Sequence, residues 1–136
     1  MENKIIVASG PVIIENGRVL LNKHGDDGFW KFPGGRAGFF EFKNNFDSLE
    51  EICCKKVYEE MGINIAIKKP LKPMMLPKSD DFETWIILVH YLADRKGKIV
   101  PGEEIKKWDW FDIDNLPNDC APNIKPVIED YLKSEA

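Results

Sequence analysis

The chain has 136 residues, of which 43% are hydrophobic and 31% are charged, a composition typical of one soluble globular domain with its own core. The net charge of -4 argues against a general binder of nucleic-acid polymers, which needs a basic surface. The sequence predicts neither a membrane span, which needs about eighteen consecutive apolar residues, nor a signal peptide. Its three cysteines form no CxxC pair, so a reducing, cytoplasmic location is expected.

The first predicted elements are strands. Residues 4–24, KIIVASGPVIIENGRVLLNKH, contain two β-branched runs separated by a Glu-Asn-Gly turn at residues 15–17, which predicts a β-hairpin. Pro11 lies inside the first run and cannot donate to a strand ladder, so it indicates an edge or a bulge. The segment GFWKFPGGR, residues 28–36, then predicts a short strand that enters a glycine turn.

A helix is predicted from Asp47 to Met61. Asp47, with Glu50 three residues later, resembles a capping box, and Gly62 is well placed to end the helix. The expected buried stripe of this helix has apolar side chains at helical spacing. Its members are Leu49, Ile52, Cys53, Val57 and Met61.

The second half of the chain is again rich in strands. Residues 63–69 and 106–113 predict strands, whereas residues 71–81 read as an irregular connection. Residues 82–94 form a long, nearly continuous apolar run, typical of a strand that is buried on both faces. Residues 123–136 predict a terminal helix with an apolar stripe. Because strands dominate and two helices can cover them, the sequence predicts one domain with an α/β or α+β sandwich.

Two charges of the central helix lie in an unusual place. On a helical wheel with steps of about 100°, Lys56 and Glu60 fall inside the apolar stripe and Glu59 lies at its border. One explanation is an exposed helix end with a Lys56–Glu60 pair, which contributes only a few tenths of a kcal/mol. The other is a polar cavity in which the carboxylates hold a cation. The pair Gly34-Gly35 favours the cavity, because glycines let the backbone approach a ligand and carboxylates suit Mg²⁺ or Mn²⁺.

The same residues resemble the signature of Nudix hydrolases, G-x5-E-x7-R-E-U-x-E-E-x-G-U, in which U is a bulky apolar residue. Gly35 and Glu41 match its opening by spacing. The residues that match its close are Val57, Glu59, Glu60, Gly62 and Ile63. The resemblance implies a single Nudix-like domain over residues 1–136, folded as an α/β/α sandwich with a central mixed β-sheet.

The sequence departs from this signature in two respects. Thirteen residues (42–54) separate Glu41 from Lys55, where the signature has seven, so the loop is expanded. The R-E pair of the signature is Lys55-Lys56 here. Lys55 keeps the charge of arginine but loses its planar fork. Lys56 reverses the charge at a position that the family uses as a metal ligand or general base.

The resemblance implies metal-dependent hydrolysis of a nucleoside diphosphate linked to another moiety, a pyrophosphohydrolase activity with Mg²⁺ or Mn²⁺ as cofactor. Glu59 and Glu60 are the expected metal ligands. Glu104 is the expected catalytic base, with Glu103 beside it. The expected substrate-binding residues, which surround the glycine turn, are Gly34, Gly35, Arg36 and Lys56.

A second function remains open from the sequence. The protein is then a catalytically impaired member of the fold that binds a nucleotide or related phosphate ligand without hydrolysis, and the Lys56 ammonium occupies the place of the metal. Both functions imply a small phosphorylated molecule as the partner, not a nucleic-acid polymer or a membrane. Members of the family often form homodimers, so a homodimer is the oligomer to consider. The sequence identifies neither the substrate nor an interface.

Overall fold

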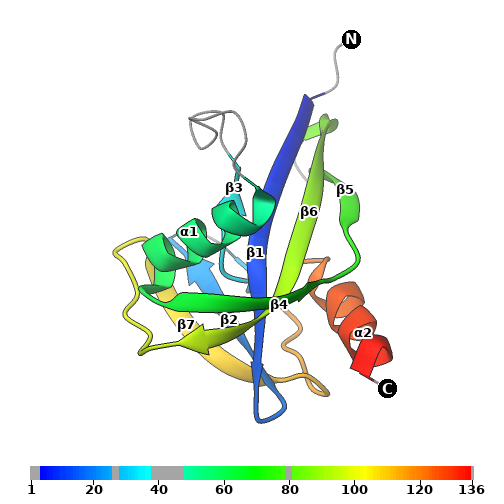
Figure 1. Ribbon diagram of the computed structural model, residues 1–136. Coiled ribbons are helices and arrows are strands. Elements are labelled where there is room, and N and C mark those ends of the chain that lie inside the picture. Colours follow the sequence, from blue (N-terminus) through cyan, green and yellow to red (C-terminus); the bar gives the residue numbers. More distant parts are fainter. Residues whose placement is uncertain (1–3, 26–27, 38–47, 79–80, 136) are drawn as a thin grey trace.

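The computed structural model describes residues 4–25, 28–37, 48–78 and 81–135 (Figure 1). In this part of the chain, seven strands form one sheet and two helices accompany it. The strands are β1 (Lys4–Glu15), β2 (Arg18–His24), β3 (Gly35–Arg36), β4 (Asn64–Pro70), β5 (Met74–Lys78), β6 (Asp81–Lys96) and β7 (Ile105–Asp112). The helices are α1 (Leu49–Met61) and α2 (Ile124–Glu135).

The sheet is mixed, as the resemblance to Nudix hydrolases implies. Its strand order is β4-β6-β1-β2-β7, with β3 beside β1 and β5 beside β6. The long strands β1 and β6 run parallel over ten residue pairs, whereas the other neighbours are antiparallel. Two parallel strands need a long crossover connection. The chain between the end of β1 at Glu15 and the start of β6 at Asp81 provides it, and this segment contains α1.

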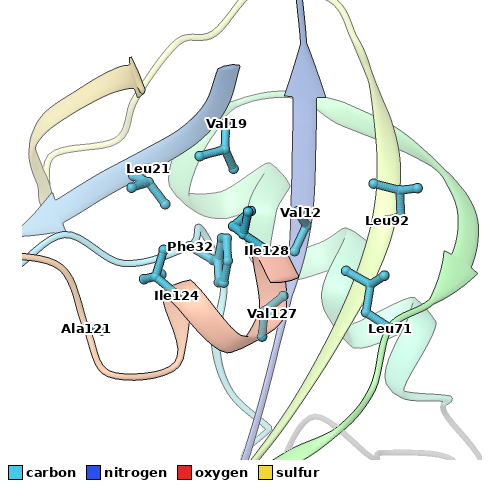
Figure 2. Packing of buried hydrophobic residues seen from close by; sticks show 10 residues of the cluster. All are labelled: Val12, Val19, Leu21, Phe32, Leu71, Leu92, Ala121, Ile124, Val127 and Ile128. Carbon is cyan, nitrogen blue, oxygen red and sulfur yellow. The ribbon is translucent and has the colours of Figure 1, made fainter. Parts of the chain in front are cut away.

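The alternation of side chains in β1 and β2 produces the sandwich. Val12 and Leu21 face a core cluster that includes Ile124 of α2, as Figure 2 shows for the α2 side. Their neighbours Ile13 and Leu20 face the other side of the sheet, where they pack with Val57 and Met61 of α1. Because successive strand residues point to opposite faces, each strand supplies both cores. The predicted α/β/α sandwich is therefore confirmed.

The first hairpin has the predicted turn. Asn16 and Gly17 have φ angles of 54° and 75°, and two positive φ values are the mark of a type I′ turn. The predicted irregularity at Pro11 also has a structural reason. One side of β1 pairs with β3 up to Ser9 and with β2 only from Ile14 onward, so Pro11 lies where β1 changes partner.

The caps of α1 differ slightly from the prediction. Ser48, not Asp47, is the N-cap residue, and its side chain accepts a hydrogen bond from the backbone N–H of Glu51 at 3.1 Å. Asp47 itself lies outside the described residues. Gly62 ends the helix as predicted, with a left-handed φ of 68° and an N–H that donates to the carbonyl of Tyr58.

Two segments were wrongly predicted. Within the irregular connection at 71–81, Met74–Lys78 form β5, which pairs antiparallel with β6 at the edge of the sheet. Pro77 is tolerated there because an edge strand has one unpaired side. Residues 28–36 form two isolated bridges and the short β3 instead of one strand. Neither helix in the described part of the chain has the length and apolar character that a membrane-spanning helix needs.

Candidate functional site

A cleft of about 420 Å³ lies where the end of α1 meets the glycine turn before β3. Four glutamates from two separate segments line it, and we call it the acidic cleft. These glutamates are Glu59, Glu60, Glu103 and Glu104. His24, Lys56 and the pair Gly34-Gly35 also line the cleft. Carboxylates therefore outnumber cations in this part of the molecule.

Glu60 connects the helix to the glycine turn. Its side chain is only 8% exposed. The backbone N–H of Gly34 donates to Oε2 at 3.0 Å, and Nε2 of His24 lies 2.6 Å from Oε1. The first explanation from the sequence, an exposed helix end with a Lys56–Glu60 pair, therefore does not describe Glu60, because its side chain is buried. The carboxylate is instead held inward with both oxygens oriented by specific partners.

The contact between Gly34 and Glu60 depends on a backbone conformation that favours glycine. Gly34 has a φ of 121°, and a Cβ atom at this position would lie 2.3 Å from the carbonyl oxygen of Ser9. The backbone of this turn therefore packs directly on β1, which leaves the N–H of Gly34 pointing at Glu60. A side chain here would both strain the backbone and push the turn away.

We expect Gly34→Ala to destabilise the fold by about 3 kcal/mol, because it adds backbone strain and a steric clash. The matched control is Gly35→Ala, since a Cβ atom at Gly35 meets nothing within 4 Å and no positive φ is involved. Urea unfolding of the wild type and both variants measures the effect. Equal midpoints for the two variants would contradict the requirement for glycine at position 34.

The loop before β7 is fastened to the end of α1. The N–H of Gly102 donates to the carbonyl of Glu60, and the N–H of Val100 donates to the carbonyl of Met61, each at 2.8 Å. These bonds satisfy helix carbonyls that lack partners inside the helix. The loop thereby carries the exposed side chains Glu103 and Glu104 to the cleft.

The remaining predicted site residues are only partly brought together. Glu59 is exposed at the cleft, and Lys56 is half-buried in its lining. Gly35 lines both this cleft and a second cavity, whereas the exposed Arg36 of β3 lines only the second cavity. Glu41 and the loop expansion near 39–46 lie outside the described residues.

The donor chemistry fits a divalent cation that arrives with phosphate. In the described ranges of the chain, no three His, Cys, Asp or Glu side chains converge as a complete ligand set. Mg²⁺ does not need such a set, because it commonly uses one or two carboxylates and completes its coordination with water and substrate phosphates. Glu59 and Glu60 supply carboxylates at the cleft, so the residues suit an ion shared with a phosphorylated ligand.

A second cavity of about 460 Å³ adjoins the cleft and shares His24 and the glycine pair with it. We call it the apolar cavity, because β1, β5 and β6 supply apolar side chains to its lining. Lys31, Arg36 and Lys78 also line it, and no Asp or Glu does so among the described residues. The two cavities therefore have opposite charge character. An extended ligand with a phosphate group near their junction would meet both.

Sequence reasoning missed His24, His90 and Asn123. His24 contacts Glu60 across 36 positions, and His90 contacts Asn123 across 33. For His24, the indication in the sequence is its position: this histidine ends a predicted strand, ten residues before the glycine turn at Gly34. For His90, the signal is a titratable residue inside an apolar strand, which requires a hydrogen-bond partner.

Known proteins are similar to this chain over most of its length. The family model described as NUDIX domain matches residues 5–131. An ADP-ribose pyrophosphatase of Methanocaldococcus jannaschii is 27% identical over 130 residues, which cover 93% of this chain and 73% of that protein.

Solved structures share the fold. The MutT NUDIX hydrolase of Burkholderia pseudomallei superimposes with a TM-score of 0.79 at 23% identity, covering 93% of this chain and 98% of that one. The MutT protein of Methanosarcina mazei Go1 gives a TM-score of 0.82 at 17% identity, with 99% and 98% covered. At these identities, the two structures establish the similarity of fold.

Proposed function

Because the chain belongs to the Nudix family, we propose that it hydrolyses a phosphoric anhydride bond in a nucleoside diphosphate linked to another moiety, with Mg²⁺ or Mn²⁺ as cofactor. The observation that carries this proposal is the buried carboxylate of Glu60, which is held on the Gly34 N–H at the wall of a cleft with three further glutamates. The three unpaired cysteines support a cytoplasmic location.

In this proposal, Glu59 and Glu60 bind the divalent ion together with the substrate phosphates. When bound, the ion polarises the phosphoryl group and neutralises the charge that develops on its oxygens. The hydrogen bonds from Gly34 and His24 fix the orientation of the Glu60 carboxylate before the ligand arrives. A carboxylate that is already oriented does not need to reorganise during the reaction.

The catalytic base is a side-chain carboxylate of the loop before β7. Glu104 is the first candidate and Glu103 the second, because both line the acidic cleft and both side chains are exposed. The carboxylate accepts a proton from the attacking water, which is the role of a general base.

The substrate phosphates are bound beside this site. Arg36, Gly35 and Lys31 line the adjoining cavity, where the positive charges of Arg36 and Lys31 favour the phosphate groups of the substrate.

Lys56 favours a second candidate function. Its half-buried side chain lines the cleft beside Glu59 and Glu60. A protonated lysine cannot be a metal ligand, and it repels a cation by about 4 kcal/mol per unit charge at 4 Å with an effective dielectric of 20. The alternative is therefore a protein that binds a nucleotide through this ammonium and does not hydrolyse it.

Phosphate release distinguishes the two functions. We would assay ADP-ribose, nucleotide sugars, dinucleoside polyphosphates and nucleoside triphosphates with Mg²⁺, with Mn²⁺ and with a chelator. Reactions that yield two phosphomonoesters need an added phosphatase for detection. The proposed enzyme turns over at least one class only when metal is present. Binding without turnover of any class under all conditions would contradict hydrolysis and favour the alternative.

A further inference from the structure

The apolar cavity contains a buried histidine whose two ring nitrogens are both engaged. His90 of β6 is 4% exposed. Its Nδ1 lies 3.1 Å from the carbonyl oxygen of Gly10, and its Nε2 lies 3.1 Å from Nδ2 of Asn123. Phe32 packs edge-on against the imidazole with a ring separation of 4.7 Å. The ring is therefore held from three directions at the wall of the cavity.

These contacts determine the tautomer of His90. A backbone carbonyl can only accept, so Nδ1 carries a proton and donates to Gly10. Burial lowers the pKa of His90 to about 4, which keeps the imidazole neutral near pH 7. A neutral imidazole has one N–H, and since Nδ1 carries it, Nε2 presents a lone pair.

The tautomer in turn determines the orientation of Asn123. Only the NH₂ group of the amide can donate to the lone pair of Nε2, so this group faces His90. Asn123 directly precedes α2, is half-buried and also lines the apolar cavity. Its hydrogen bond to His90 uses one N–H. The carbonyl oxygen and the second N–H of the same amide remain chemically able to pair with a ligand.

We propose that His90 is a positioning residue that fixes the amide of Asn123 in one orientation, so that the cavity recognises a flat heterocycle with a donor beside an acceptor. A nucleobase has such an edge, and the apolar lining suits its faces. The inference deepens the proposed function and rests on it for the nucleotide character of the ligand. It concerns the selection of the base and not the cleavage of the phosphate bond.

Binding measurements without turnover test this role separately from hydrolysis. We would titrate AMP, GMP, CMP and UMP, with ribose 5-phosphate as the probe that lacks a base, and record calorimetric affinities. The wild type is expected to bind at least one of the nucleotides about tenfold more tightly than ribose 5-phosphate, which corresponds to about 1.4 kcal/mol. Equal affinities for all five probes would overturn the proposal even if the protein hydrolyses another substrate.

A double-mutant cycle tests whether His90 acts through Asn123. His90→Phe keeps an aromatic ring against Phe32 but removes the lone pair. It should abolish the preference for the nucleotide and leave the affinity for ribose 5-phosphate unchanged. Asn123→Ala should do the same, and His90→Phe should then have no further effect in the Asn123→Ala background. An undiminished effect of His90→Phe in that background would contradict the assignment.

Two further measurements keep the test decisive if His90→Phe does not fold. Asn123→Asp leaves β6 intact, and an ionised carboxylate cannot donate to Nε2, so the base preference should again be lost. Nitrogen NMR of the wild type should show the His90 proton on Nδ1 and not on Nε2. A proton on Nε2, or an unchanged base preference in Asn123→Asp, would overturn the proposal. With a substrate that is turned over, Asn123→Asp should raise KM more than it lowers kcat.

Discussion

Glu60→Gln is expected to reduce metal-dependent phosphate release by about a hundredfold or more, which corresponds to about 3 kcal/mol of lost transition-state stabilisation. The substitution removes one negative charge from the wall of the acidic cleft. The amide of glutamine is nearly the same size as the carboxylate, and its carbonyl oxygen can still accept from the N–H of Gly34. The variant should therefore fold while losing the charge that attracts a cation.

The control for this prediction is Glu129→Gln, which neutralises an exposed glutamate of α2. It should retain wild-type activity, and both variants should melt within a few degrees of the wild type. Steady-state kinetics with each metal measures the difference between them. If Glu60→Gln keeps wild-type kcat and KM, the carboxylate of Glu60 has no part in the reaction and its partners serve the fold alone.

Lys56→Glu is expected to increase metal-dependent turnover by about tenfold or more, equivalent to about 1.4 kcal/mol. The change removes a positive charge from the cleft and adds an oxygen ligand for Mg²⁺ or Mn²⁺. It also restores the acidic residue that the family signature has at this position. The concentration of metal needed for half-maximal rate should fall in parallel, because the cleft gains negative charge.

Two further variants separate the causes. Lys56→Gln removes the cation without adding a carboxylate, so it measures the repulsion alone. Lys68→Glu makes the same change of charge at an exposed position of β4 and should leave turnover unchanged. Lower activity in Lys56→Glu than in the wild type would mean that the lysine itself contacts the substrate. That outcome supports the phosphate-binding role of Lys56.

Most elements of the fold could be predicted because their signals are local. The hairpin follows from the turn residues at 15–17, and the end of α1 follows from Gly62. β5 was missed because Pro73 before it and Pro77 within it are typical of a loop, although an edge strand tolerates Pro77. The N-cap was misplaced by one residue because Asp47 and Ser48 are both good capping residues in sequence.

Only part of the candidate site could be predicted from the sequence, because some of its contacts join residues that are far apart in the chain. The glutamates of α1 and the glycine pair belong to one continuous motif, so their proximity follows from a short segment. The contacts of His24, His90 and Asn123 instead depend on how distant strands pair. His90 reaches Gly10 across 80 positions because β1 and β6 are parallel neighbours. No local pattern determines such a pairing, and the orientation of the Asn123 amide follows from it.

The binding of Mn²⁺ in the presence of a nucleotide tests the account most directly. Electron paramagnetic resonance counts free Mn²⁺ in a titration of the wild type and of Glu60→Gln, each with and without ADP-ribose, after subtraction of the Mn²⁺ bound by the ligand itself. The wild type should retain Mn²⁺ much more tightly when the ligand is present, whereas Glu60→Gln should lose that gain. If ligand and Mn²⁺ bind the wild type independently, or the two proteins retain the ion equally, the acidic cleft does not hold a cation shared with phosphate.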